Sequence, residues 1–283
     1  MAIRSAKFVT YEYQHGPAVG AVVGDEIVDL SDAGKSLRAV IATGPLDNLQ
    51  AAIARRAPSV KLDHVVFHQV VPDAARVICV GKNYRDHAKE MGGEPPSNPN
   101  LFLRTPKSLV GHNQSIVCPS ASTQFDYEGE LGVIIGKGGR RIPLDRALTH
   151  VAGYTCFMDG SVRDYQKHSF TAGKNFDSSG ACGPWLTPAA QVPDPQALAI
   201  ETRVNGVVMQ KARTSEMIYS VAEIIAYCSI FTHLEPGDVI ATGTPAGVAA
   251  GRTPPPWLKP CDRVEVEIEG IGVLANTVIA ERL

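Results

Sequence analysis

Alternation of apolar and polar side chains runs through most of this chain and predicts β-strands rather than long helices. Near the start it indicates three short strands, at 7–13, 18–24 and 26–30, separated by breaks that contain glycine. Further on, the same alternation, or a short apolar run between turn residues, predicts strands at 65–71, 76–81, 115–119, 129–136, 150–159, 198–206, 238–243, 263–270 and 272–280. We therefore expect a mainly β protein.

Apolar residues that recur every three or four positions predict helices in only three places. These are 36–59, 82–91 and 217–229. Segment 94–100, EPPSNPN, contains three prolines and is expected to be a loop. So few helices between so many strands argue against a Rossmann or TIM-barrel fold, and no glycine-rich phosphate loop follows a strand. The fold class is therefore predicted to be mainly β with some α (α+β).

A possible join between two parts of the chain lies at Val71-Pro72-Asp73. We expect a small N-terminal α/β module at 1–72 and a larger, mainly β domain at 73–283. The N-terminal module carries no motif that points to chemistry, so its role as a lid or a scaffold for association is open.

Composition narrows the class of protein without changing the predicted fold. Of 283 residues, 44% are hydrophobic and 20% charged, and the net charge is −2, which is typical of a globular protein and does not favour nucleic acid or membrane as a partner. The start of the chain lacks the apolar run of a signal peptide, and no apolar stretch is long enough to span a bilayer. Six cysteines without a CxxC pair are expected to be reduced thiols of a cytoplasmic protein.

The stretch DYEGELGVIIG places Glu128 and Glu130 directly before an apolar run. In a strand these two side chains point to the same face, as two ligands of one cation must. A third carboxylate, Asp159, ends another apolar strand. Oxygen ligands favour Mg²⁺, Mn²⁺ or Ca²⁺ over zinc. The alternatives are solvated glutamates on an exposed strand and an aspartate that caps a turn.

Two other stretches carry candidate chemistry. In NYRDHAKE, His87 and Glu90 are i, i+3 neighbours on a predicted helix, so the carboxylate can fix the imidazole tautomer and leave the other ring nitrogen as a base. The alternative is a solvated helix surface. Lys174 lies between small residues in AGKNFDSSG, where its ammonium group could approach an anionic substrate. That stretch, like the glycine-rich LEPGDVIATGTPAGV, could also be a structural turn.

Taken together, these stretches resemble the fumarylacetoacetate hydrolase family. The resemblance covers about residues 76 to 280 and rests on several unusual motifs in a fixed order. They are VGKNYRDHAKE, FLRTPKSLVG, DYEGELGVIIGK, VAGYTCFMDGSVRDYQ, AGKNFDSSGACGPW, VNGVVMQ and LEPGDVIATGTPAGV.

The resemblance implies a rolled mixed β-sheet in the catalytic domain and assembly as a homodimer. It implies a Mg²⁺ or Mn²⁺ ion, with Ca²⁺ possible in crystals, held by Glu128, Glu130 and Asp159. It also implies three catalytic residues and four substrate-binding residues. The catalytic residues are His87 and Glu90, which would activate water, and Lys174, which would stabilise negative charge; the substrate-binding residues are Tyr84, Arg163, Gln166 and Thr244.

The activity implied by the resemblance is hydrolysis of a C–C bond in an acylpyruvate-like or fumarylpyruvate-like 2-oxo acid. It would proceed through a metal-bound enolate, with water activated by His87. Two alternatives stay open. One is a decarboxylase, isomerase or hydratase of the same family acting on oxaloacetate-like or related acids, and the other is a non-catalytic, metal-stabilised binding protein.

Three positions depart from the pattern of the family. Cys261 stands where the family usually has glycine, and Arg104 stands where lysine is more usual. Val80 occupies the place where larger members of the family have a further aspartate ligand, so we expect three protein ligands for the ion.

Overall fold

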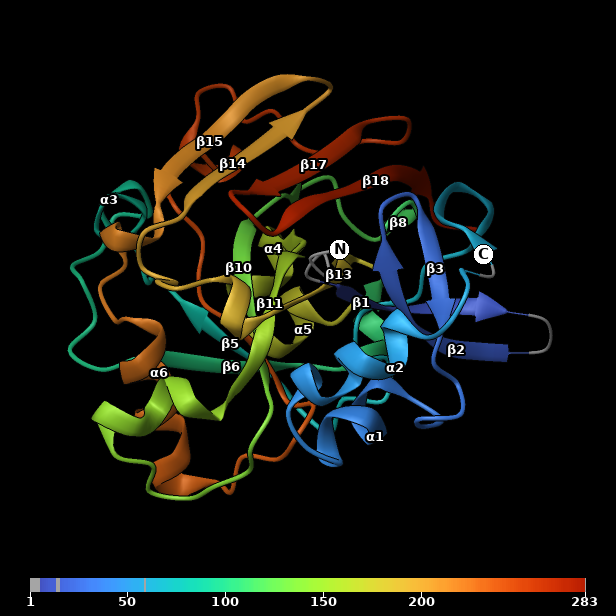
Figure 1. The fold of residues 1–283 in the computed structure, drawn as a ribbon. Coiled ribbons are helices and arrows are strands. Elements are labelled where there is room, and N and C mark those ends of the chain that lie inside the picture. The colour runs from blue at the N-terminus through green and yellow to red at the C-terminus, as the bar shows by residue number, and fades with distance from the viewer. Residues whose placement is uncertain (1–5, 14–15, 59, 283) are drawn as a thin grey trace.

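The computed structural model describes residues 6–13, 16–58 and 60–282, and within them two β-sheets form most of the molecule (Figure 1). The larger sheet has eleven strands: β1 (Lys7–Tyr13), β2 (Gly16–Val23), β3 (Glu26–Asp29), β4 (Val60–Lys61), β5 (Val77–Gly81), β6 (Asn100–Arg104), β7 (Leu109–Val110), β10 (Gly129–Ile135), β11 (Val151–Met158), β13 (Gly180–Pro188) and β16 (Val239–Ala241). Ten of them follow the order β4-β3-β2-β1-β13-β11-β10-β16-β5-β6, and β7 pairs with β13.

The smaller sheet lies across one face of the larger sheet (Figure 1). Its order is β15-β14-β17-β18-β8, with bounds β8 (Ile116–Cys118), β14 (Ala199–Val204), β15 (Val207–Arg213), β17 (Arg263–Ile268) and β18 (Gly272–Ala280). A separate pair is formed by β9 (Phe125–Asp126) and β12 (Ser161–Val162). The prediction of a mainly β chain with a mixed sheet is confirmed.

The helices are short and lie between strands. They are α1 (Leu37–Ala42), α2 (Gln50–Ala54), α3 (Arg85–Glu90), α4 (Arg163–Gln166), α5 (Phe170–Lys174) and α6 (Val221–Phe231). The 3₁₀ turns are η1 (Leu46–Leu49), η2 (Leu62–His64), η3 (Pro106–Ser108), η4 (Leu144–His150), η5 (Ala189–Gln191), η6 (Thr214–Glu216) and η7 (Ala249–Gly251). Within the described residues, no helix has both the length and the apolar character needed to cross a bilayer.

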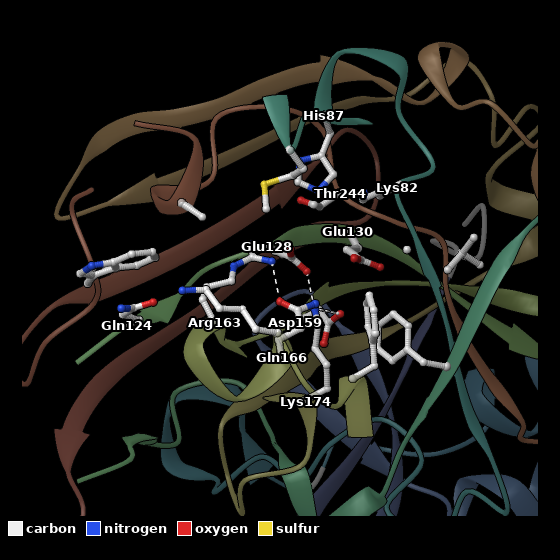
Figure 2. Close-up of a pocket in the computed structure, with 18 residues that line it drawn as sticks. Lys82, His87, Gln124, Glu128, Glu130, Asp159, Arg163, Gln166, Lys174 and Thr244 are labelled. Atoms are coloured by element: carbon white, nitrogen blue, oxygen red, sulfur yellow. Dashed lines mark hydrogen bonds and ion pairs between the residues drawn. The ribbon is translucent and has the colours of Figure 1, made fainter. Parts of the chain in front are cut away.

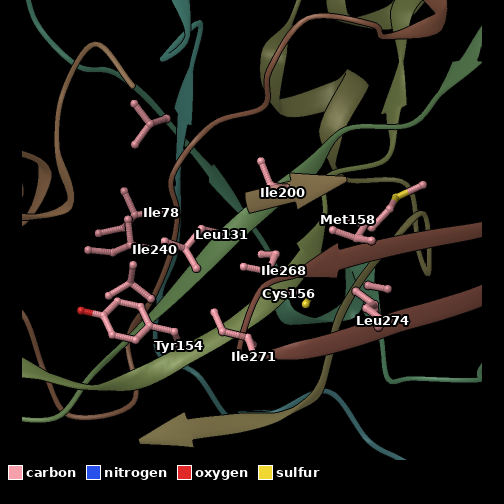
Figure 3. Close-up of a cluster of buried hydrophobic side chains, with 14 of the residues drawn as sticks. Ile78, Leu131, Tyr154, Cys156, Met158, Ile200, Ile240, Ile268, Ile271 and Leu274 are labelled. Atoms are coloured by element: carbon pink, nitrogen blue, oxygen red, sulfur yellow. The ribbon is translucent and has the colours of Figure 1, made fainter. Parts of the chain in front are cut away.

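The main hydrophobic core lies between the two sheets (Figure 3). Leu131 of β10 and Ile268 of β17, both fully buried, belong to this core. Ile134, also in β10, belongs to a second core that contains Leu37 of α1. Because successive side chains of a strand point to opposite faces, β10 contributes to both cores, and all seven of its residues are buried. The apolar run after Glu130 is therefore a central strand.

The predicted strand at 65–71 is not a strand. Within it only Phe67 forms an isolated bridge, to Tyr11 in β1. The apolar pattern has another cause, because Phe67, Val70 and Val71 are buried side chains of an irregular segment that packs beside the sheet.

Strand β13 was not predicted, although it lies between β1 and β11 at the centre of the larger sheet. Its glycines and proline hide the alternation that marks a strand. The structure explains these small residues, since a Cβ atom on Gly180 would lie 2.7 Å from the carbonyl oxygen of Met158. Close packing between strands thus selects residues that normally suggest a turn.

All three predicted helices have different bounds, and the one predicted at 82–91 is shortened to Arg85–Glu90. The pattern at 36–59 is divided into α1, η1 and α2, and Ser59 lies outside the described residues. The helix predicted from 217 begins at Val221, because Ser220 and Glu223 form a capping box that fixes its start.

The first 72 residues are continuous with the rest of the fold. Strand β1 pairs with β13 through Phe8 and Leu186, so the four N-terminal strands extend the sheet that carries the central strands. The second hydrophobic core also combines residues from both sides of the expected join. A division at residue 72 stays a prediction.

Cys261 adopts a backbone φ of +77°, in the left-handed region that favours glycine. We expect Cys261→Gly to raise the free energy of unfolding by about 0.5–1 kcal/mol, because relief of the strain outweighs the entropy that glycine adds to the unfolded chain. Urea denaturation would measure the change. Cys261→Ala is the matched control, because it removes the thiol but keeps the strain. Equal gains in both variants would contradict a backbone cause.

Candidate active site and metal centre

A cavity of about 430 Å³ brings together residues that are far apart in the sequence (Figure 2). His87 comes from α3, Glu128 comes from the segment that joins β9 to β10, and Glu130 lies in β10 itself. Asp159 follows β11, and Lys174 ends α5. The five residues are buried, and at most 4% of the surface of each is exposed. Because they line the same cavity and are all buried, the site that they form is largely dehydrated.

The three carboxylates predicted as metal ligands converge in this cavity. Oxygen atoms of Glu128, Glu130 and Asp159 lie within 4.8 Å of one another. The antiparallel register of β10 and β11 is responsible, because Gly129 pairs with Met158 and the amide of Asp159 donates to the carbonyl of Glu128 over 2.8 Å. Sheet pairing thus adds the third carboxylate to the two that share a strand face.

Three buried cations hold these carboxylates in place. The Nζ atom of Lys174 donates to Glu128 Oε2 at 2.5 Å and to Asp159 Oδ2 at 2.6 Å. Arg163 donates to Glu128 Oε1 at 2.6 Å, and Arg104 donates to Asp159 Oδ1 at 2.5 Å. Charge-assisted bonds of this kind fix the orientation of a carboxylate.

Glu130 differs from its two neighbours because no cation in the described part of the chain bonds to it directly. Its Oε2 accepts a hydrogen bond of 2.8 Å from the amide of Gly243. Burial, together with the charges of Asp159 and Glu128, raises the pKa of Glu130 well above its usual range. Burial also acts to raise the pKa of Glu128, but Lys174 and Arg163 outweigh it and lower that pKa.

This donor set fits a divalent cation. The three carboxylates offer hard oxygen atoms, which suit Mg²⁺ or Mn²⁺. A second observation agrees: among the described residues, the buried carboxylates Asp126, Glu128, Glu130 and Asp159 have three buried cations bonded to the cluster, which leaves one negative charge without a partner when all four are ionised. A cation beside Glu130 would offset it.

His87 and Glu90 form the pair that the sequence predicts. The Nδ1 atom of His87 lies 3.1 Å from Glu90 Oε2, and His87 lines the cavity. A carboxylate at this distance favours a proton on Nδ1 and leaves Nε2 as the basic nitrogen. The arrangement can accept a proton from a molecule bound in the cavity.

The glycine-rich loop after β16 holds Glu90 and Glu130 through backbone amides. Gly247 donates to Glu90 Oε1 at 2.9 Å, and Gly243 donates to Glu130. Both glycines have positive φ angles, +107° and +100°, and a Cβ on Gly243 would lie 2.6 Å from Cβ of Asn83. The loop therefore needs glycine at these positions to approach both acids.

The structure places three of the four predicted substrate-binding residues in the cavity: Arg163, Gln166 and Thr244. Arg163 also donates to Asp126 and to Oε1 of Gln166, so it makes three hydrogen bonds to protein side chains in addition to lining the cavity. Thr244 Oγ donates to the carbonyl of Gly129. The lining of this cavity does not include Tyr84, which lines a different hollow beside Glu216, and its role as a substrate contact stays a prediction.

Sequence reasoning missed Asp126, and it noted Arg104 only as a departure from the family pattern. Asp126 is buried and accepts bonds from Arg163 and from the amides of Ala249 and Ala250, so it fastens the loop at η7 to the carboxylate cluster. The sequence did indicate a role for Asp126, since it precedes Glu128 by two positions and continues the same alternation. The contact between Arg104 and Asp159 gave no such signal, because only the fold brings β6 to Asp159.

Comparison with known proteins gives both a family and individual relatives. The model of the fumarylacetoacetate (FAA) hydrolase C-terminal family matches residues 76–279. Oxaloacetate tautomerase YisK of Bacillus subtilis (strain 168) is 39% identical over 96% of this chain and 99% of its own length.

Solved structures agree with this relationship. Fumarylacetoacetate hydrolase from Exiguobacterium antarcticum has a TM-score of 0.85 and 37% identity, over 98% of this chain and 100% of its own. Maleylpyruvate hydrolase from Sphingobium sp. SYK-6, in complex with manganese(II) ion and pyruvate, has a TM-score of 0.83 and 28% identity, with the same coverage. A divalent metal at the carboxylate cluster accords with that manganese complex. The match over about three quarters of the chain, the full-length relatives and the shared fold show that this chain belongs to the fumarylacetoacetate hydrolase family of enzymes.

Proposed function

We propose that this enzyme interconverts the keto and enol forms of oxaloacetate with the help of a divalent metal ion. The observation that carries the proposal is the placement of His87, which is bonded to Glu90, in the same cavity as the three carboxylates. Proton transfer beside a carbonyl group needs a base and a means of stabilising the enolate. The activity of YisK, an oxaloacetate tautomerase related over nearly the whole chain, supports this choice of substrate.

The residues of the chain have separate tasks in this reaction. A divalent ion held by Glu128, Glu130 and Asp159 would polarise the 2-oxo group and favour the enolate. His87 Nε2 takes the proton from C3 while Glu90 holds Nδ1–H, and the imidazolium then returns the proton to the 2-oxo oxygen. No atom is gained or lost by the substrate. The ammonium group of Lys174 stabilises negative charge in the cavity.

Hydrolysis of an acylpyruvate-like acid is the second candidate. The same imidazole can take a proton from water instead of from carbon, and the resulting hydroxide attacks the distal carbonyl group. Maleylpyruvate hydrolase, which shares this fold, supports this alternative. Under both proposals the substrate is a small 2-oxo acid. Homodimer formation and cytoplasmic location stay predictions.

A panel of substrates distinguishes the two reactions. Metal-stripped enzyme would be given Mg²⁺ or Mn²⁺ and assayed for loss of the oxaloacetate enol, cleavage of acylpyruvates and decarboxylation of oxaloacetate. We expect tautomerisation to have the highest kcat/KM. A higher value for cleavage would support the hydrolase, and a higher value for decarboxylation would support that alternative. Absence of all three activities with either ion would contradict a catalytic role on these substrates.

A further inference from the structure

We propose that Arg104 is a positioning residue of the metal centre. It fixes the carboxylate of Asp159 so that one oxygen is held away from the cavity and the other is presented to the ion. The proposal concerns metal binding, so it holds whichever reaction the site catalyses. Its basis is the set of hydrogen bonds around a guanidinium group that is completely buried.

Each N–H group of Arg104 has an acceptor in the protein. Nη1 donates to Asp159 Oδ1 at 2.5 Å and to the carbonyl of Gly160 at 2.9 Å. Nε donates to the hydroxyl of Ser108 at 3.0 Å, and Nη2 donates to the carbonyl of Ser108 at 3.1 Å and to the hydroxyl of Ser179 at 2.9 Å. The five donors of the planar group are all used, so the group cannot rotate without losing bonds.

The two oxygens of Asp159 consequently have different partners. Oδ1 is held by Arg104, whereas Oδ2 is held by Lys174, which also bonds to Glu128. Rotation of the carboxylate would break both charge-assisted bonds at once. A group that forms a hydrogen bond to a metal-binding side chain, without touching the ion, orients that side chain and changes its affinity for the ion. Arg104 has this place relative to Asp159.

The surroundings are shaped for arginine. A Cβ atom on Gly180 would lie 2.9 Å from Nη2 of Arg104 and 3.0 Å from its Cζ, so the missing side chain leaves room for the flat group. The hydroxyls of Ser108 and Ser179 are buried and accept from it. A lysine could keep the charge beside Asp159, but its ammonium group could not reach both serines.

Arg104 could act on the metal site by orienting Asp159 or by its charge alone, and these two explanations predict different effects of Arg104 variants on metal affinity. If Arg104 acted only through its charge, Arg104→Gln would tighten binding of a divalent cation, and Arg104→Lys would leave it unchanged. If Arg104 positions Asp159, both variants weaken binding, because both lose the fork that holds Oδ1. The charge-preserving variant Arg104→Lys is therefore the decisive one.

The experiment is a titration of the metal-stripped full-length protein with Mn²⁺, in which free Mn²⁺ is followed by electron paramagnetic resonance. We expect Arg104→Lys to raise the Kd for Mn²⁺ by about tenfold and Arg104→Gln by about 10–100-fold. The rise in Tm on adding saturating Mn²⁺ should fall in the same order. A wild-type Kd in Arg104→Lys would overturn the proposal.

A matched control separates positioning from general loss of stability. Arg76 is also paired with a buried carboxylate, Asp238, outside the cavity. Arg76→Lys should leave the Kd for Mn²⁺ unchanged. If the Arg104 variants fail to fold, Ser179→Ala keeps the arginine but removes one of its acceptors, and we expect a rise of a few-fold in Kd. An unchanged Kd in Ser179→Ala would then refute the proposal.

Discussion

His87→Asn should lower kcat for oxaloacetate tautomerisation by about 10²–10⁴-fold, because loss of a general base typically has an effect of this size. Asparagine cannot accept and return a proton. The imidazole of His87 is oriented by Glu90 and lines the cavity, so no small shift of another side chain replaces it. The measurement is the rate of enol loss at saturating Mn²⁺, corrected for the uncatalysed rate.

Glu90→Gln should have a similarly large effect for a different reason. The Oε1 atom of Glu90 accepts from the amide of Gly247, so a glutamine would keep its oxygen there and turn its NH₂ group toward His87 Nδ1. The imidazole would then carry its proton on Nε2 and lose its basic nitrogen on the cavity side. This outcome resembles the loss of the orienting aspartate in a Ser-His-Asp triad, which leaves the histidine in the wrong tautomer.

Controls decide whether these losses are chemical. Both variants should bind Mn²⁺ with the wild-type Kd, since neither residue is a proposed ligand. His68 and Glu12 form another histidine–glutamate pair, at 2.7 Å, outside the cavity, so His68→Asn should keep full activity. Wild-type kcat in His87→Asn would show that the base is another group.

Glu130→Gln should abolish metal-dependent activity and at the same time stabilise the metal-free protein. Loss of one of three ligands should raise the Kd for Mn²⁺ by at least about 100-fold, more than the usual effect of changing a supporting residue. Glutamine keeps the hydrogen bond from Gly243 but removes a charge that faces Glu128 and Asp159. Catalysis and stability should therefore respond in opposite directions.

The pH dependence of this stabilisation follows from the pKa of Glu130. The folded pKa is raised above the ordinary value of 4.5, so ionisation of Glu130 opposes folding as the pH rises above 4.5, and the cost is complete above the folded pKa. We expect metal-free Glu130→Gln to melt above the wild type at pH 8 and close to it at pH 4. A gain of about 1 kcal/mol corresponds to about 2–4 °C in a chain of this size.

Thermal unfolding in the presence of a chelator measures this difference. The matched control is Glu265→Gln, because Glu265 lies in β17 away from the cavity and pairs with Arg203. Its Tm without metal should not rise, and its gain of Tm with Mn²⁺ should equal that of the wild type. A lower Tm of metal-free Glu130→Gln at pH 8 would contradict the electrostatic argument.

Local patterns in the sequence were sufficient wherever neighbours along the chain decide the structure. Alternation identified the central strand β10 and placed Glu128 and Glu130 on one face, because side chains in a strand repeat every two residues. Helical spacing identified the contact between His87 and Glu90, which are three positions apart. The family motifs added the expectation of a rolled mixed sheet to the mainly β fold that the alternation predicts.

Sequence patterns failed where packing overrides local preference. Segment 65–71 is apolar because it packs beside the sheet, not because it pairs within it. Strand β13 begins with Gly180, where the carbonyl of Met158 and the guanidinium of Arg104 leave no room for a Cβ atom, so its start lacked the pattern that marks a strand. Burial and pairing are separate properties, and an apolar run alone reports only burial.

By itself, the sequence determined which residues share a strand face or a helix turn, and through its motifs the family to which the chain belongs. Only the tertiary structure decided that the register of β10 and β11 brings Asp159 to Glu128, and that Arg104 reaches Asp159 from an edge strand. Tyr84, expected at the substrate, lines another hollow, beside Glu216. Contacts between residues far apart in the chain depend on sheet order and register, which are set by the packing of the whole fold.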